Sequence, residues 1–103
     1  LLKASAVVDK AKNNGTTPLY MACENGHVDV LRLLLEADAA INQARDDGVT
    51  PLYVACYKGH VEIVRLLLAA SAAINQAKNN GATPLHVACQ EGDPAVVIFL
   101  LRA

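Results

Sequence analysis

The sequence TPLYMAC at residues 17–23 returns as TPLYVAC at 50–56 and as TPLHVAC at 83–89. Each copy lies 33 positions after the one before it. A fixed period of this length is typical of a chain built from small units that stack on one another, and not of a globule with one central core. The spacing therefore predicts a solenoid before any single residue is interpreted.

Each unit carries the same local signals around that string. An Asn-Gly or Asp-Gly turn precedes a Thr-Pro pair, and a glycine separates the following short segment from a second, more apolar one. Thr can cap a helix, and Pro fits the first helical position because the amide there has no intrahelical partner. The first unit is thus predicted to form helices over 19–25 and about 28–37. Both are too short to persist alone in water, so stacking must stabilise them.

The repeated strings resemble the ankyrin repeat, whose signature T-P-L-H-x-A and period of about 33 residues fit the third copy at every signature position. The first two copies each differ at one position, where Tyr20 and Tyr53 replace His. The GHV strings at 26–28 and 59–61 and the INQ strings at 41–43 and 74–76 also fit the family. The resemblance implies an all-α solenoid of helix-turn-helix units with short β-hairpin-like turns.

The period divides the chain into units at residues 11–43, 44–76 and 77–103, the last of them ending inside its second helix. Residues 1–10 look like the tail of a partial leading unit, because LLKA at 1–4 has the repeat phase of LLRA at 100–103. Terminal units of solenoids normally carry a polar outer face, which the apolar run at 96–101 does not offer. We therefore expect a segment of a longer array, or end-to-end association of copies through uncapped terminal repeats.

Composition argues against two classes of partner. The net charge of −1 does not fit a general nucleic-acid binder, which needs a concentrated basic face. The longest apolar runs are far shorter than the roughly 20 residues that span a bilayer, and residues 1–3 do not begin a signal peptide. We expect no nucleic-acid partner and no membrane partner.

The three cysteines, Cys23, Cys56 and Cys89, occupy one repeat position, so we expect them to share one environment at a tight helix contact. Stacked helices lie about 8 to 10 Å apart. That separation exceeds the Cα distance of roughly 7 Å that a disulfide tolerates. An odd number of unpaired thiols fits a reducing intracellular compartment, cytoplasmic or nuclear. A metal or redox role is the alternative.

No catalytic set emerges from the remaining reactive side chains. His27 and His60 recur in Gly-His pairs, and His86 belongs to the third signature, so packing or loop bonding explains them best. The family resemblance implies that such histidines bond neighbouring backbone. The HExxH, CxxC and Walker-type patterns are absent. We expect no enzyme activity, no metal and no cofactor.

The resemblance implies that function lies on a concave surface made by the turn tips and the exposed face of each first helix. Residues 11–43 and 44–76 differ at twelve of 33 positions, and six of these differences fall on that surface. A merely solvated face would vary in the same way, so that alternative stays open. The candidate partner-binding residues are Asn13, Asn14, Thr16, Glu24, Asn25, Asp46, Asp47, Val49, Tyr57, Lys58, Asn79, Asn80, Ala82, Gln90 and Glu91.

Tyr57 is the strongest single candidate, because an exposed Tyr combines a rigid apolar ring with a hydroxyl, as interface hot spots do. Lys12, Arg45 and Lys78 form a basic row where the family often has Asp, and this row could select an acidic peptide or simply be solvated. We therefore expect non-catalytic binding of a protein or peptide. The alternative is a structural spacer in a longer array, or an engineered scaffold with no natural ligand.

Some positions depart from the family pattern. Ser5, Asp38 and Ser71 stand where a Gly often follows the second helix, and a left-handed backbone there would cost roughly 1 kcal/mol per residue. In the third unit, Asp93 and Pro94 replace a His-Val pair and should open a helix of their own.

Asn42 and Asn75 lie in strings that resemble the family's asparagine-hydroxylation sites. Hydrogen bonding within the loop is the simpler role for both.

Overall fold

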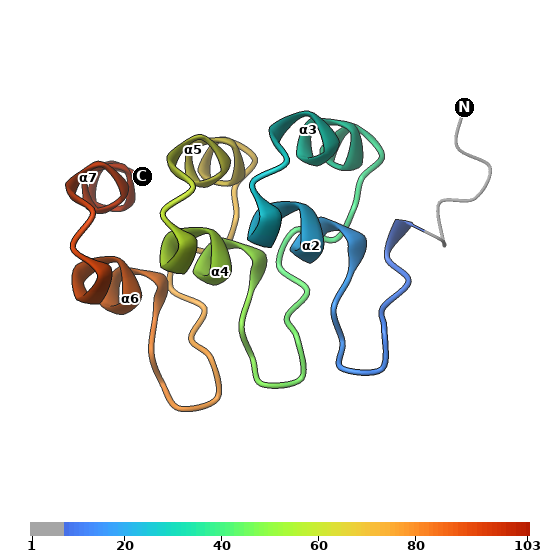
Figure 1. Cartoon of the computed structure of the whole chain (residues 1–103), viewed down its shortest axis with the longest axis horizontal. Coiled ribbons are helices and arrows are strands. Elements are labelled where there is room, and N and C mark those ends of the chain that lie inside the picture. Colours follow the sequence, from blue (N-terminus) through green and yellow to red (C-terminus); the bar gives the residue numbers. More distant parts are fainter. Residues whose placement is uncertain (1–7) are drawn as a thin grey trace.

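The computed structural model describes residues 8–103 of the chain. In that part of the chain six helices alternate between two layers, and long turns project from one edge (Figure 1). The first layer, next to the turns, contains α2 (Pro18–Asn25), α4 (Pro51–Lys58) and α6 (Pro84–Glu91). The second layer contains α3 (Val28–Glu36), α5 (Val61–Ala69) and α7 (Pro94–Arg102). The predicted all-α solenoid of helix-turn-helix units is confirmed.

The first-layer helices begin as the Thr-Pro pairs predict. The Thr17 hydroxyl accepts a hydrogen bond from the Tyr20 amide at 3.1 Å, and a proline follows at the first helical turn. Thr50 caps α4 in the same way. In α6 the Thr83 amide also donates to His86 Nδ1 at 2.9 Å, which completes a capping box. Local side chains therefore satisfy amides that a short helix would otherwise leave unpaired.

Left-handed residues end the helices and set the angle of the next one. Gly26 ends α2 with a φ of 74°. Asp38 and Ser71, which replace the family's glycine after the second helix, also adopt positive φ values of 59° and 68°. Each of these two side chains costs about 1 kcal/mol at such a φ, least for Asp. The corresponding prediction for Ser5 lies outside the described residues.

The start of α7 follows the Asp-Pro signal. Asp93 accepts a hydrogen bond from the Ala95 amide at 3.0 Å through its side chain, and Pro94 occupies the first helical position. The departure from the family pattern thus replaces one helix start with another.

The core is a continuous layer of aliphatic side chains between the helices. Each first-layer helix packs on the next, α2 on α4 and α4 on α6, and the second layer repeats this order. Leu19, Leu52 and Leu67 are at most 1% exposed. Because every such contact joins neighbouring units, each unit buries its apolar face on the next one.

The prediction that the three cysteines share one environment is wrong for Cys89. Cys23 and Cys56 are fully buried, whereas Cys89 is exposed. The difference arises because α2 and α4 are each covered by a following first-layer helix, and α6 is the last of the described ones. All three thiols are free.

Backbone hydrogen bonds join successive turns into a ladder. The Asp46 amide donates to the Asn14 carbonyl at 2.9 Å, and the Asn79 amide donates to the Asp47 carbonyl at 3.0 Å. Within the first turn, the Lys12 amide donates to the Thr16 carbonyl. The turns therefore have hairpin-like bonding, although no strand forms in residues 8–103.

Side chains form a second set of bonds between units. Asn42 accepts a hydrogen bond from the Ala73 amide at 2.8 Å, so it bonds a loop as predicted, but the loop of the next unit and not its own. The same role for Asn75 stays a prediction. Asp9, one period before Asn42, accepts from the Ala40 amide in the same manner. His60 Nε2 bonds the carbonyl of Glu24 at 3.1 Å, as the resemblance implies for these histidines. Each bond fixes one unit on its neighbour.

Candidate functional site

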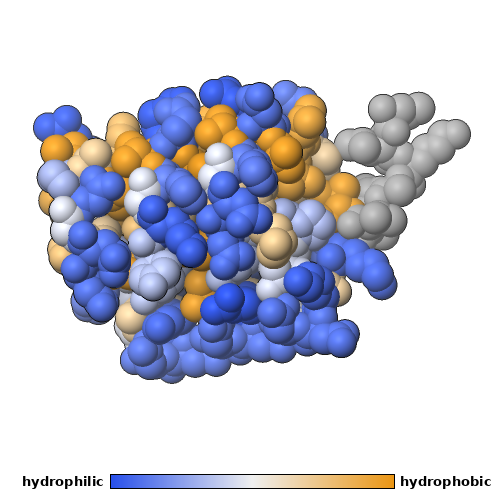
Figure 2. Space-filling model, in the orientation of Figure 1, coloured by the Kyte–Doolittle hydropathy of each residue, from blue (hydrophilic) through white to orange (hydrophobic). Residues whose placement is uncertain are grey.

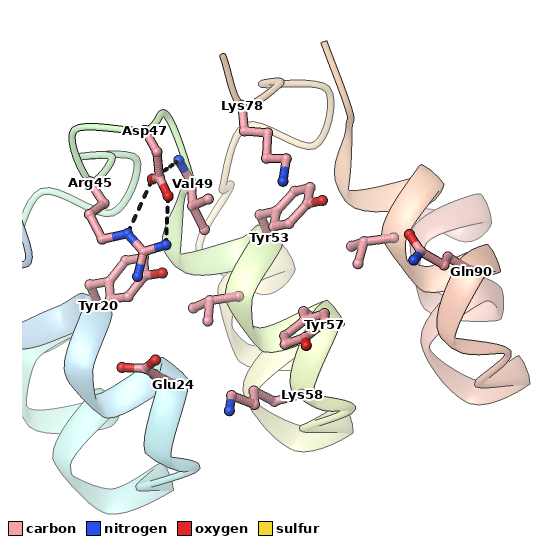
Figure 3. Close-up of a pocket in the computed structure, with 12 residues that line it drawn as sticks. Tyr20, Glu24, Arg45, Asp47, Val49, Tyr53, Tyr57, Lys58, Lys78 and Gln90 are labelled. Atoms are coloured by element: carbon pink, nitrogen blue, oxygen red, sulfur yellow. Dashed lines mark hydrogen bonds and ion pairs between the residues drawn. The ribbon is translucent and has the colours of Figure 1, made fainter. Parts of the chain in front are cut away.

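A groove of about 350 Å³ runs along the exposed side of the first layer, beside the turns (Figure 3). It crosses α2, α4 and α6, so all three units contribute to it. We call it the central groove. Its lining residues are Tyr20, Glu24, Arg45, Asp47, Val49, Tyr53, Val54, Tyr57, Lys58, Lys78, Val87 and Gln90.

Helical spacing brings the aromatic and polar lining residues together. Tyr53 and Tyr57 are four residues apart on α4, and Tyr20 and Glu24 have the same spacing on α2, so each pair lies on one helix face. Tyr20 and Tyr53, the first residues of the two pairs, are buried at the groove floor. Tyr57 is 51% exposed at the rim. The groove therefore has an apolar floor and a rim with charged and aromatic side chains.

Two departures from the family pattern meet in the groove. The guanidinium of Arg45 lies 5.3 Å from the ring centre of Tyr20, and the ammonium of Lys78 lies 5.4 Å from that of Tyr53. In both cases a basic residue from one turn covers the Tyr that replaces His in the preceding unit. Cation–π attraction of this kind contributes about 0.5 to 1 kcal/mol at exposed positions. Arg45 and Lys78 are thus not simply solvated, whereas Lys12, the first residue of the basic row, is exposed.

Arg45 is also paired within its own turn. Its Nε donates to Asp47 Oδ1 at 3.1 Å, and a second guanidinium nitrogen lies 2.6 Å from Oδ2. The hydrogen bond from Arg45 holds the pKa of the Asp47 carboxyl below its usual range. Asp47 additionally accepts the Val49 amide at 3.1 Å. Asp47 therefore neutralises the charge of Arg45 within the same turn.

The Tyr20 hydroxyl is the most isolated polar group in the groove. The side chain is 1% exposed, and within residues 8–103 its hydroxyl has no hydrogen-bond partner. Burial raises the pKa of this phenol to about 12, so it remains protonated. Arg45 lies over the ring face and makes no hydrogen bond to this hydroxyl.

The structure places six of the fifteen predicted contact residues in the groove: Glu24, Asp47, Val49, Tyr57, Lys58 and Gln90. The other nine lie outside its lining: Asn13, Asn14, Thr16, Asn25, Asp46, Asn79, Asn80, Ala82 and Glu91.

The expected exposure of Thr16 and Val49 is wrong, because only 4% and 6% of these residues is exposed. The turn folds back at this position: Asn14 and Asp47 accept hydrogen bonds from the two amides, and Val49 joins the apolar core.

Four lining residues were absent from the sequence-based contact set: Tyr20, Tyr53, Val54 and Val87. Arg45 and Lys78, which also line the groove, belong to the basic row. Helical spacing could have identified the tyrosines, since each lies four residues before a predicted contact residue. A second signal is that Tyr replaces His at 20 and 53, while Arg or Lys replaces the family's Asp at 45 and 78.

Within residues 8–103 no three His, Cys, Asp or Glu side chains gather as metal ligands would. None of the helices described there has both the length and the hydrophobicity required to cross a membrane.

Comparison with protein families gives two matches. Residues 38–103 match the model for ankyrin repeats in three copies, and residues 14–46 match the model for a single ankyrin repeat. Together the matches extend over residues 14–103, which include every helix of the central groove. Comparison with curated proteins gives no match.

Proposed function

Because the chain belongs to the ankyrin repeat family, we propose that it binds a protein or peptide in the central groove without catalysing a reaction. Ankyrin repeats are generally protein–protein interaction modules, and the family is typically non-catalytic. The proposed units, residues 11–43, 44–76 and 77–103, each supply one turn and one first-layer helix to this face. The predicted tip residues outside the lining would extend the contact surface around it.

The exposure of Tyr57 is the observation on which this proposal depends. The residue is 51% exposed at the rim, midway along the groove, on the one first-layer helix that has a described neighbour on both sides. The residues beneath it, Tyr53 and Val54, are at most 8% exposed. An exposed aromatic ring on a rigid floor binds with little loss of conformational freedom, which favours affinity.

The proposal is tested by capture of partners from cell lysate on the intact chain and on the double variant Tyr57→Ala/Lys58→Ala. Truncating a hot-spot Tyr costs about 2 kcal/mol or more, so the variant should lose the partner. The matched control is Arg32→Ala/Leu33→Ala, which removes one basic and one apolar side chain, both exposed, from α3. Circular dichroism should show the same helix content in all three proteins.

A partner that the intact chain and the α3 control retain, and that the groove variant loses, supports recognition through the central groove. Equal retention by all three proteins would reject the groove as the binding surface. No retained partner from folded material would favour the structural role described next.

A second candidate, end-to-end association of copies or of further units, follows from the two end faces. Leu85 is 37% exposed, whereas its equivalents Leu19 and Leu52 are at most 1% exposed. At the opposite end Val30 is 46% exposed, whereas its equivalent Ile63 is 1% exposed. Within residues 8–103, the outermost helices on both sides therefore present apolar side chains that a neighbouring unit covers elsewhere in the array. Such stacking would give the chain a structural spacer role.

A further inference from the structure

The central groove has two halves that differ in charge (Figure 3). The half between α2 and α4 contains two carboxylates, Glu24 and Asp47, and two cations, Arg45 and Lys58. The half between α4 and α6 is lined by Tyr53, Tyr57, Val87 and Gln90, and Lys78 is the charged residue that reaches it from its turn. The Lys58 ammonium lies 5.8 Å from the ring centre of Tyr57, at the border between the two halves. The first half is balanced, and the second carries a net positive charge.

An exchange at one turn position explains this difference. Asn80 stands one period after Asp47, and the two side chains make the same turn bond: Asp47 accepts the Val49 amide at 3.1 Å, and Asn80 accepts the Ala82 amide at 3.0 Å. The backbone is thus conserved while the carboxylate is lost. Arg45 is paired within its turn, whereas Lys78 forms no ion pair with any residue in 8–103.

The surroundings of Lys78 keep its charge in the groove. Its ammonium lies 5.4 Å from the ring centre of Tyr53, and the side chain is half-buried. Val87, 2% exposed, and Tyr53, 8% exposed, form the apolar floor. A charge beside apolar walls attracts an opposite charge more strongly than one in open water does. A cationic partner residue would be repelled at the same place.

We propose, on the basis of the function proposed above, that the half of the groove between α4 and α6 selects an acidic peptide segment. A partner aspartate or glutamate binds the Lys78 ammonium, and an adjacent apolar side chain packs on Tyr53, Tyr57 and Val87. Lys78 is therefore the residue that determines specificity. The exposed Gln90 amide at the rim offers a donor to the same carboxylate or to the peptide backbone.

Peptides that bind the whole chain are selected from a random dodecapeptide library displayed on phage. The affinity of the enriched peptides is then measured for the intact chain and for its variants. Lys78→Gln removes the charge. Asn80→Asp adds the carboxylate that Asp47 supplies one unit earlier, and it retains the acceptor for the Ala82 amide. The matched control is Lys12→Gln, which makes the same change at the same repeat position outside the groove. Tyr57→Ala tests the groove as a whole.

We expect the enriched peptides to contain Asp or Glu next to an aliphatic or aromatic residue. A hydrogen bond to a charged group contributes about 1.5 to 3 kcal/mol, so Lys78→Gln should raise Kd by about tenfold or more. Asn80→Asp should act in the same direction, and Lys12→Gln should leave Kd unchanged. Added salt should weaken the intact chain's binding more than that of Lys78→Gln.

Peptides that require Tyr57 but bind Lys78→Gln as tightly as the intact chain would overturn the acidic preference and leave the proposed function standing. An equal loss in Lys12→Gln would show a general charge effect and would also overturn it. Peptides that depend on neither Tyr57 nor Lys78 would contradict both proposals.

Discussion

At the scale of single residues, burial decides which side chains can react. Cys23 and Cys56 are fully buried beneath the following helix, and burial raises the pKa of each thiol to about 12. Cys89 has the same repeat position but is exposed. Thiol reagents attack the thiolate and need access to it, so the three cysteines should differ sharply in reactivity.

We predict that Ellman's reagent at pH 8 titrates one thiol per native chain and three after denaturation. Cys89→Ser should abolish the native reaction. In the unfolded chain the buried thiols ionise near pH 9.0, and in the folded chain they do so only near 12. Their contribution to stability is therefore complete below about pH 9 and is lost as the pH rises towards 12. Rapid modification of two or three native thiols would contradict the burial described here.

Some features of single residues can be predicted from the sequence, and others cannot. The capping roles of Thr17 and Asp93 follow from their own side chains and immediate neighbours, and both are confirmed. The exposure of Cys89 and the pairing of Arg45 depend on other turns and helices, so the residue alone does not reveal them. Repeat position therefore predicts hydrogen bonds to adjacent residues better than it predicts the exposure of a side chain or its more distant partners.

At the scale of the helix pair, the glycine after each first helix has a backbone role, and Gly26 has a packing role as well. Gly26 and Gly92 have the same φ of 74°. A Cβ at Gly26 would lie 2.9 Å from His60 Cε1, whereas a Cβ at Gly92 would meet nothing within 4 Å. The His60 ring is held in place by its bond to the Glu24 carbonyl, so it does not move aside freely.

We predict that Gly92→Ala lowers the free energy of unfolding by about 1 kcal/mol, the cost of a left-handed Ala. Gly26→Ala should lower it by about 1 kcal/mol more, because the His60 hydrogen bond must also be strained or lost. Urea denaturation followed by circular dichroism measures both. Equal destabilisation by the two variants would show that the His60 contact does not restrict this position.

At the scale of the whole molecule, exposed hydrophobic residues bear on the proposed end-to-end association of copies. Figure 2 shows hydrophilic residues along the edge where the turns project, and hydrophobic residues exposed over the second layer. Leu101 is 68% exposed on α7, whereas its equivalents Leu35 and Leu68 are half-buried. Ile98, 46% exposed on the same helix, corresponds instead to Arg32 and Arg65, which are exposed in every unit.

We predict that the mass measured by sedimentation equilibrium rises with concentration, because apolar end faces can cover one another as units do. Leu101→Glu should keep the chain monomeric. Ile98→Glu, the same change one helical turn away, should associate as the unaltered chain does. A monomer at all concentrations, or dispersal by Ile98→Glu as well, would reject end-to-end stacking.

The fold as a whole was predictable because its signals are local and repeat three times. The central groove was predictable only in part. Tyr57 and Lys58 follow from exposed positions on one helix, but the stacking of Arg45 on Tyr20 joins a turn to the helix of the preceding unit. Such contacts depend on how units are rotated against each other, and no single unit specifies that rotation.

The ladder of bonds between units has a consequence for how such a chain can change in length. The Asp46–Asn14 and Asn79–Asp47 backbone bonds each join residues 32 apart, and every principal helix contact lies within a unit or between adjacent units. Duplicating residues 44–76 in the gene would insert a unit whose two faces already fit their neighbours. A duplication of 30 residues would leave the ladder out of register. Insertion of a whole period should therefore preserve the contacts between units. Each added period would lengthen the groove by one turn and one helix.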